Sequence, residues 1–240
     1  MADILKAIEI EGEYLIHRMN DEEPFHLKDE IEKCGFKSLD DYFEAKREYE
    51  FEKLKFTETD ITQEEVLNEL STVFENKTIG VWFCDHPKTC VFGGYQGIDN
   101  FNEEYCIEND IVVYPFLSGG GIIVHKDGDF TYGLSCPNNL NIDAGFILDK
   151  TRRILQKYTN KRVTVDGNDI LVNGLKVCGS TVYNKNGLFL ILIYFSFNDK
   201  SELIKSICNK EMIKKPAYID FMTREQLRLE VAKWLSIQST

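Results

Sequence analysis

From residue 78 onward, the sequence is a succession of short runs of β-branched and aromatic residues separated by turn residues. Runs of this composition predict β-strands. Two of the connections, Asn173-Gly174 and Asn186-Gly187, have the residues favoured in two-residue hairpin turns. Connections this short favour antiparallel pairing, because parallel neighbours need a longer crossover. The expected strands are 79–83, 89–93, 111–115, 121–125, 130–135, 162–165, 169–172, 176–180 and 188–197.

Helical patterns interrupt and end this series of strands. Apolar residues at helical spacing predict helices over 142–158, 199–208 and 223–236, and residues 1–60 are polar and mostly helical in pattern. We therefore expect an α+β fold in which a mixed, mostly antiparallel sheet is packed with helices. The expected domains are an acidic, mostly helical N-terminal extension over 1–60 and a main domain over 61–240.

The charge distribution argues against nucleic acid as a partner. Residues 1–76 hold 22 acidic and 9 basic residues, whereas residues 77–240 hold 18 acidic and 19 basic ones. Neither part has the basic stripe of a nucleic-acid binder. No apolar run reaches the length of a membrane helix, and no secretory signal is recognisable. The seven cysteines form no C-x-x-C pair, so we expect a reduced, cytoplasmic protein without membrane association.

Two segments between expected strands have the residues of a ligand site. Ser118-Gly119-Gly120-Gly121 offers consecutive amides that can approach a ligand closely, although a flexible hairpin turn is an equal alternative. His125 follows these glycines by a few strand residues. In the second segment, Asn168 and Asp169 open one strand and Lys176 opens its hairpin partner, where an amide, a carboxylate and an ammonium group can bind Mg²⁺ and phosphate. A solvated surface hairpin is the alternative for this pattern.

Taken together, these segments resemble the lipoate-protein ligase family, within the group of biotin and lipoate protein ligases and octanoyltransferases. The similarity covers about residues 62–237 and implies a biotin/lipoate ligase-like catalytic domain. Its most specific block is Asn168-Asp169-Ile170-Leu171-Val172-Asn173-Gly174-Leu175-Lys176-Val177-Cys178-Gly179-Ser180, followed by Ser118-Gly119-Gly120-Gly121-Ile122-Ile123-Val124-His125, Val81-Trp82-Phe83 and Pro87 to Gly93 with Tyr95-Gln96.

The resemblance implies attachment of lipoate, or a similar medium-chain acyl acid, to a lysine of an acceptor. ATP would activate the acid as an acyl-adenylate, and the acceptor would be a lipoyl domain or a glycine-cleavage H protein. Lys176 would be the catalytic lysine, and Asp169 would also position Mg²⁺. Trp82, Gly93, Tyr95 and Gln96 would line the acyl pocket. Substrate and ATP would contact Ser118, Gly119, Gly120, Gly121, His125, Asn168, Asp169, Gly179 and Ser180.

The sequence departs from the family pattern in three places. After the lysine strand, Asn186-Gly187-Leu188 stands where the family has His-Gly-Thr. Pro115-Phe116-Leu117 stands where the family has paired arginines before the glycines, which removes charge that would bind the adenylate. The family's C-terminal accessory domain has no counterpart after the catalytic pattern, so a separate accessory protein is an expected partner.

The sequence is also compatible with other functions on the same fold. An ATP-independent octanoyl or lipoyl transferase needs a cysteine nucleophile. Cys178 would share a face with Lys176 and Ser180 by strand alternation, whereas Cys208 falls on an apolar helix face. A biotin-protein ligase would carry a lysine where Val165 stands. A catalytically degenerate binding protein on the same fold is the remaining alternative, since fold does not establish activity.

Overall fold

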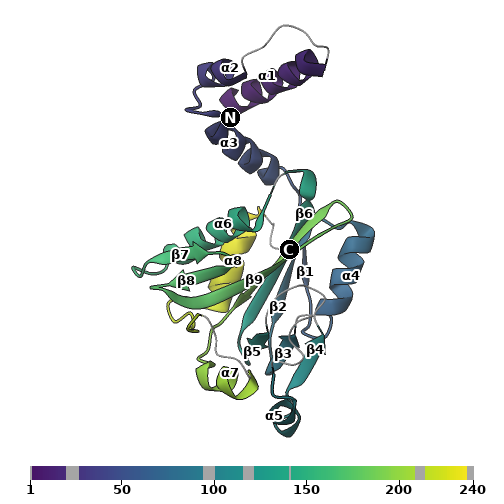
Figure 1. The fold of residues 1–240 in the computed structure, drawn as a ribbon, viewed down its shortest axis with the longest axis vertical. Helices are drawn as coiled ribbons and strands as arrows, with labels where there is room; N and C mark the ends of the chain where they lie inside the picture. Colours follow the sequence, from purple (N-terminus) through teal and green to yellow (C-terminus); the bar gives the residue numbers. More distant parts are fainter. Residues whose placement is uncertain are drawn as a thin grey trace. The chain divides into compact units, whose positions relative to one another are not determined.

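A computed structural model describes residues 2–19, 27–93, 101–115, 122–140, 142–208 and 214–236. The chain divides into two compact units, residues 1–54 and 55–240 (Figure 1). The division falls before the boundary at residue 60 expected from the sequence, because residues 57–60 form a strand that pairs within the second unit.

In its described residues, the first unit is built from three helices, as the polar helical pattern predicts. Their apolar sides meet around the buried ring of Tyr42, which packs with Ile4, Ala7 and Ile31. The Ser38 side chain caps the third helix by accepting a hydrogen bond from the Asp41 amide. The helices are α1 (Ala2–Met19), α2 (Leu27–Lys33) and α3 (Leu39–Glu52).

The second unit contains a seven-stranded sheet with the order β1-β2-β6-β10-β9-β8-β7. Only the β1–β2 pair is parallel, and the other neighbours are antiparallel. The mixed, mostly antiparallel sheet expected from the sequence is confirmed. Its strands are β1 (Thr57–Asp60), β2 (Gly80–Asp85), β6 (Phe130–Pro137), β7 (Val163–Asp166), β8 (Asp169–Val172), β9 (Leu175–Lys185) and β10 (Leu188–Phe195).

Over the part of this unit that the structure describes, a second, three-stranded sheet and five helices complete it. In the small sheet, β3 lies between β4, which runs parallel to it, and β5, which runs antiparallel. These strands are β3 (Cys90–Gly93), β4 (Val112–Pro115) and β5 (Ile123–His125), and the helices are α4 (Val66–Asn76), α5 (Glu103–Glu108), α6 (Ala144–Gln156), α7 (Ser201–Ile207) and α8 (Arg224–Trp234), with a 3₁₀ turn at Asn138–Leu140.

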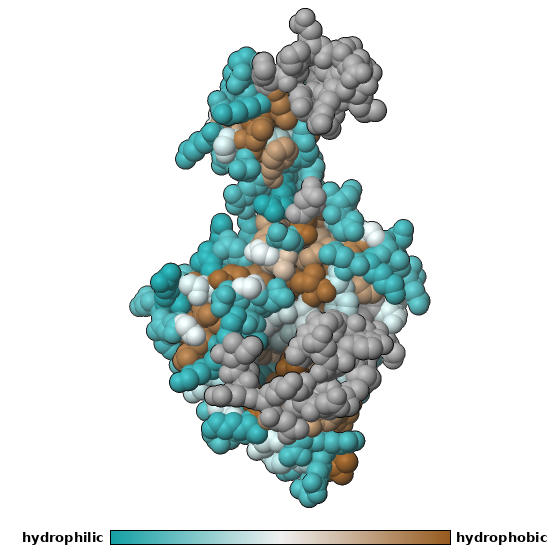
Figure 2. All heavy atoms as spheres, viewed as in Figure 1, coloured by the Kyte–Doolittle hydropathy of each residue, from teal (hydrophilic) through white to brown (hydrophobic). Residues whose placement is uncertain are grey.

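The large sheet lies between two layers that cover its two faces. On one face, α6 packs beside α8 and reaches β6, where the Thr151 and Tyr132 hydroxyls are hydrogen-bonded (Figure 1). On the other face, Val73 and Phe74 of α4 and Phe92 of the small sheet join one apolar cluster with Trp82 and Leu190. On the face of the second unit drawn in Figure 2, most of the coloured surface is hydrophilic, and hydrophobic residues show only in patches between the hydrophilic ones.

The hairpin turns that define the strand order form as the sequence predicts. Asn173 and Gly174, and likewise Asn186 and Gly187, have positive φ angles, which a type I′ turn requires at both central positions. The polar strand β1 has no such signal in the sequence. It is held to the sheet edge in part by Arg228 of α8, which pairs with Glu58 and Asp60.

Within the described ranges, no helix combines the length and apolar character needed to cross a bilayer.

Candidate functional site

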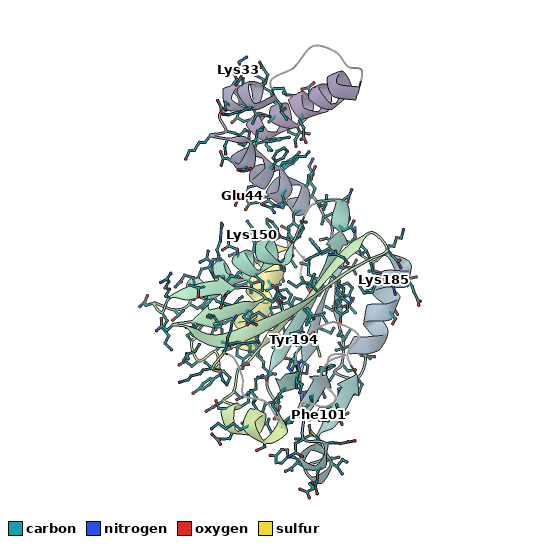
Figure 3. The ribbon with its side chains drawn as sticks, viewed as in Figure 1. Lys33, Glu44, Phe101, Lys150, Lys185 and Tyr194 are labelled. Carbon is teal, nitrogen blue, oxygen red and sulfur yellow. The ribbon has the colours of Figure 1, made fainter. Side chains whose placement is uncertain are left out.

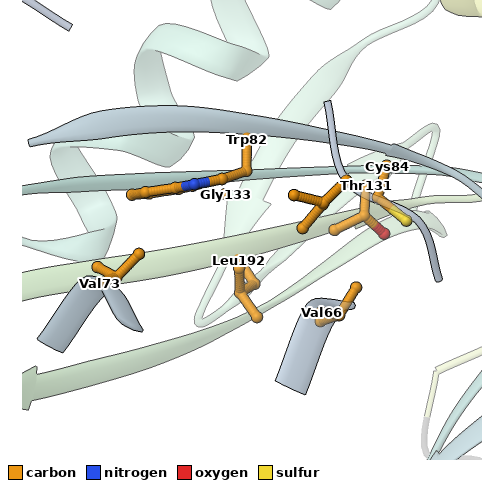
Figure 4. A pocket seen from close by; sticks show the side chains of 8 residues that line it. Val66, Val73, Trp82, Cys84, Thr131, Gly133 and Leu192 are labelled. Carbon is orange, nitrogen blue, oxygen red and sulfur yellow. The ribbon is translucent and has the colours of Figure 1, made fainter. Parts of the chain in front are cut away.

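An apolar pocket lies between α4 and the large sheet (Figure 4). It holds about 320 Å³ of empty space, including its open mouth. Trp82, which the sequence placed in the acyl pocket, forms part of its wall, and Gly133 lies beside it. A Cβ atom at Gly133 would stand 2.7 Å from Leu192 Cδ2, so glycine keeps this space open. The lining residues are Ile61, Val66, Val73, Trp82, Cys84, Thr131, Gly133 and Leu192.

Lys176 and Asp169 form an ion pair at the other end of the same sheet. The Lys176 Nζ atom lies 2.8 Å from Asp169 Oδ1, and about a third of the lysine side chain is exposed (32%). Gly179 explains how the lysine reaches this position. A Cβ atom there would lie 3.2 Å from both Cε and Nζ of Lys176, which is close enough to displace the side chain. The expected nearness of Lys176 to Asp169 across the hairpin is thus found.

One continuous row of opposed residues connects the pocket with this ion pair. Across neighbouring strands, Cys84 faces Thr131, Thr131 faces Tyr194, Tyr194 faces Gly179, and Gly179 faces Asp169. Directly opposed residues project from the same face of a sheet. Tyr194, which is labelled in Figure 3, is the middle residue of this row by strand register. With strands about 4.8 Å apart, the row covers about 14 Å between Thr131 and Asp169. The pocket and the ion pair therefore lie on the same face of the sheet and together form the candidate site.

A β-bulge in β9 separates Cys178 from Lys176. The register shifts between Ile170 and Leu171, so that Lys176 faces Leu171 whereas Cys178 faces Ile170. Since Ile170 and Leu171 are consecutive residues of β8, they point to opposite faces. The expectation that Lys176 and Cys178 share a face is therefore wrong. Cys178 is buried on the face covered by α6 and α8, and burial raises the pKa of its thiol.

Asp169 binds a second lysine that the sequence analysis did not identify. Lys214 Nζ lies 2.8 Å from Asp169 Oδ2, 3.0 Å from Asp166 Oδ2 and 2.9 Å from the Asp166 carbonyl oxygen. The hydrogen bond that Lys214 donates to Asp169 raises the pKa of Lys214, which keeps this side chain protonated. No motif marks Lys214, because its position depends on a contact with residues 45 positions away.

His125 ends β5 of the small sheet, and its buried ring contacts Tyr194 of the row. Its ring stacks on His86, with centroids 3.6 Å apart and planes 8° apart. His86 Nε2 lies 2.9 Å from Thr131 Oγ1, but among the described residues neither ring nitrogen of His125 has a hydrogen-bond partner. Burial, followed by the charge of Lys200, lowers the pKa of His86 to about 3. Burial also lowers the pKa of His125 well below its usual range. Both imidazoles are therefore neutral at neutral pH.

The remaining expected site residues divide into three groups. Asn168 is exposed in the turn between β7 and β8, and its carbonyl oxygen accepts a hydrogen bond of 2.9 Å from the Ser180 hydroxyl. This hydrogen bond from Ser180 stabilises the turn. Gly93 ends β3 in the small sheet, opposite Pro115, and its expected place in the acyl pocket stays a prediction. Tyr95, Gln96, Ser118, Gly119, Gly120 and Gly121 lie outside the described residues.

A magnesium ion at Asp169 does not fit this arrangement. Both carboxylate oxygens already accept ammonium protons, one from Lys176 and one from Lys214. Over the described part of the chain, no three His, Cys, Asp or Glu side chains are grouped to hold a metal ion. Asp169 serves instead as the shared anion of two lysines.

The fold and the family match define a class of protein, the catalytic domains of lipoyl protein ligases. The family described as the lipoyl protein ligase A/B catalytic domain matches residues 59–224. This chain belongs to that family. A comparison with curated protein sequences found no match.

Solved structures of lipoate ligases share this fold. LipL1 from P. falciparum, in complex with lipoate, has a TM-score of 0.64 and 16% identity, over 75% of this chain and 61% of its own. A putative lipoate protein ligase from T. acidophilum with bound lipoic acid has a TM-score of 0.63 and 13% identity, over 76% and 85%. Lipoate-protein ligase A bound with ATP has a TM-score of 0.60 and 14% identity, over 75% and 82%. This chain thus matches less than two thirds of the P. falciparum protein.

Proposed function

We propose that this chain attaches lipoate, or a similar medium-chain acyl acid, to a lysine of an acceptor lipoyl domain by way of an ATP-derived acyl-adenylate. The observation that carries the proposal is the single row of residues that joins the apolar pocket to Lys176 and Asp169. An acyl tail in the pocket would direct its carboxylate along this row, toward the ammonium group. The lipoate and ATP seen in the related structures support the same assignment.

The proposed reaction has two steps. First, a carboxylate oxygen of the acyl acid attacks the α-phosphorus of ATP, a new P–O bond forms, and pyrophosphate leaves. Lys176 stabilises the negative charge that develops on the phosphoryl oxygens. Second, the neutral amine of the acceptor lysine attacks the acyl carbonyl carbon, the C–N bond forms, AMP leaves, and the amine loses a proton to solvent.

The proposed acceptor is a lipoyl domain, with a glycine-cleavage H protein as the other acceptor expected from the resemblance. A bipartite lipoate protein ligase from T. acidophilum has been solved with its E2 lipoyl domain, at a TM-score of 0.63 and 14% identity. Because that ligase is bipartite, we also propose a separate accessory protein as a partner of this chain. One condition of each activity assay therefore includes such a subunit.

Lipoate-dependent exchange of labelled pyrophosphate into ATP tests the first step without any acceptor. We expect exchange that requires both the acid and this protein, with or without an added accessory subunit. ATP labelling that is equal with and without lipoate under both conditions would contradict adenylation and leave the binding-protein alternative.

Filling the pocket should weaken acyl binding without affecting nucleotide binding. In Gly133→Ala, the new methyl group meets Leu192 Cδ2 at 2.7 Å and approaches Trp82 Cε3 at 3.5 Å. Overpacking of this kind should lower the affinity for lipoate by about ten-fold or more. Calorimetric titration with lipoate and with ATP measures both effects. Gly12→Ala is the matched control, because a Cβ atom there contacts nothing within 4 Å. Unchanged lipoate affinity in Gly133→Ala would place the acyl chain elsewhere.

The transferase alternative requires a nucleophilic cysteine, and Cys178 is the candidate nearest to Lys176. A nucleophilic cysteine must form a thiolate, whereas burial raises the pKa of this thiol and the side chain lies on the face away from Lys176. We therefore expect Cys178→Ala to retain the lipoylation rate within about two-fold. A parallel assay with an octanoyl carrier protein and no ATP completes the test. Acceptor modification in that assay that disappears in Cys178→Ala would support the transferase instead. Cys208 packs beside Ile204 and Ile207, and burial raises its pKa too.

A further inference from the structure

The net charge around Lys176 depends on how many lysines bind Asp169. An isolated ion pair between a lysine and an aspartate has no net charge, so it would attract a phosphate only weakly. Here, however, Lys214 binds the second oxygen of the same carboxylate, at 2.8 Å. Asp169 and its two lysines together carry one excess positive charge. Asp166, the other carboxylate near Lys214, is more than half exposed (61%), and solvent screens it more strongly.

The hydrogen bonds of the two ammonium groups differ. Lys214 has three acceptors within 3.0 Å, namely one oxygen of Asp169 and two of Asp166, which matches its three N–H donors. For Lys176, by contrast, Asp169 Oδ1 is the acceptor that the described residues place near its Nζ atom. Lys176 therefore has donors available for a ligand, whereas those of Lys214 are occupied.

The backbone fixes Lys214 in this place. The Lys176 amide donates to the Lys215 carbonyl oxygen at 2.9 Å, and the Ala217 amide donates to the Lys176 carbonyl oxygen at 2.7 Å. Residues 215–217 thus run beside the first residues of β9, in a parallel bridge between Lys176 and Pro216. Lys214 comes just before the residues of this bridge. The bridge therefore holds the backbone of Lys214 near Lys176, from where its side chain reaches Asp169.

We propose that Lys214 is a positioning residue that balances the charge of Asp169, so that Lys176 keeps a positive charge available for the phosphate of a nucleotide. This inference rests on the proposed function for the identity of the ligand. It also explains how the chain works without the paired arginines that Pro115-Phe116-Leu117 replaces, since Lys214 supplies a positive charge from a different part of the chain.

The test compares AMP, which has a phosphate, with adenosine, which lacks one, by calorimetric titration of four proteins. Lys214→Gln should bind AMP about ten-fold more weakly than the wild type while binding adenosine equally well. Lys214→Arg should recover most of this loss. Lys215→Gln is the matched control, because it removes the same charge from an exposed neighbouring residue. A merely structural role for Lys214 would weaken the binding of both ligands.

A double variant separates charge balance from direct contact. If Lys214 acts by neutralising Asp169, then Asp169→Asn in the Lys214→Gln background should return AMP affinity to within about three-fold of the wild type. Absence of this rescue, equal loss of AMP and adenosine, or wild-type AMP affinity in Lys214→Gln would each overturn the inference.

The inference and the proposed function can fail separately. If the AMP results agree but lipoate-dependent pyrophosphate exchange is absent, then Lys214 has the role proposed and the ligase reaction is wrong. If the wild type binds AMP no more tightly than adenosine, then Lys176 is not a phosphate site and both are contradicted.

Discussion

Replacing Lys176 by alanine should slow lipoyl transfer by about 10²- to 10³-fold, the usual loss when one preorganised group that stabilises transition-state charge is removed. The fold should survive, because Lys176 is partly exposed and Asp169 keeps its bond to Lys214. Single-turnover transfer, followed by the mass of the acceptor, measures the effect. Lys176→Arg should also be slow, since a planar guanidinium cannot replace a compact ammonium group that passes over Gly179.

The matched control for this variant is Lys185→Ala. Lys185 is an exposed lysine at the far end of the same strand (Figure 3). The Lys185→Ala variant should transfer lipoate at the wild-type rate. A Lys176→Ala protein that modified the acceptor as fast as this control would remove Lys176 from the mechanism.

The stacked pair of His86 and His125 should make the stability of the second unit strongly dependent on pH. Both pKa values are lowered by burial, that of His86 to about 3. Below a pH of about 6.5, the unfolded chain therefore binds protons that the folded chain does not, and stability falls as the pH falls. The slope for each histidine reaches about 1.4 kcal/mol per pH unit only well below the unfolded pKa of about 6.5, so the two together cost about 2.5 kcal/mol between pH 7 and pH 5.5.

Urea unfolding followed by tryptophan fluorescence measures this loss. Both tryptophans, Trp82 and Trp234, lie in the second unit, so the signal excludes the N-terminal helices. In His125→Phe, one of the two protonation sites is removed and the aromatic packing against Phe92 and Tyr194 is kept. The pH dependence of this variant should be about half that of the wild type. A wild-type unfolding free energy that stays constant over this range would show that the pair is protonated in the folded state.

The sequence predicts the large sheet well where local signals decide the structure. The two Asn-Gly turns determine the β8–β9–β10 hairpins, and the limits of β8 agree with those expected. Strand β1 was not predicted, because its residues are polar and its place depends on pairing with β2 and on Arg228, which is distant in the sequence.

The sequence likewise predicts only those parts of the candidate site that depend on local signals. Trp82, Asp169, Lys176 and Gly179 fall on one face, and their spacing along β2, β8 and β9 is local information. The β-bulge in β9 could not be read from a pattern of alternating residues, so the sequence placed Cys178 on the wrong face. Lys214 and His86 reach the site from segments with no motif, and only the tertiary structure brings them there.

The most direct test of the account is the intact mass of an unmodified lipoyl domain after incubation with this protein, lipoate, ATP and Mg²⁺. A parallel reaction without ATP and one with an added accessory subunit complete the measurement. We predict a mass gain of one lipoyl group that requires ATP and is lost in Lys176→Ala. No gain under either ATP condition, or an equal gain without ATP, would contradict the assignment of this chain as an ATP-dependent lipoate ligase.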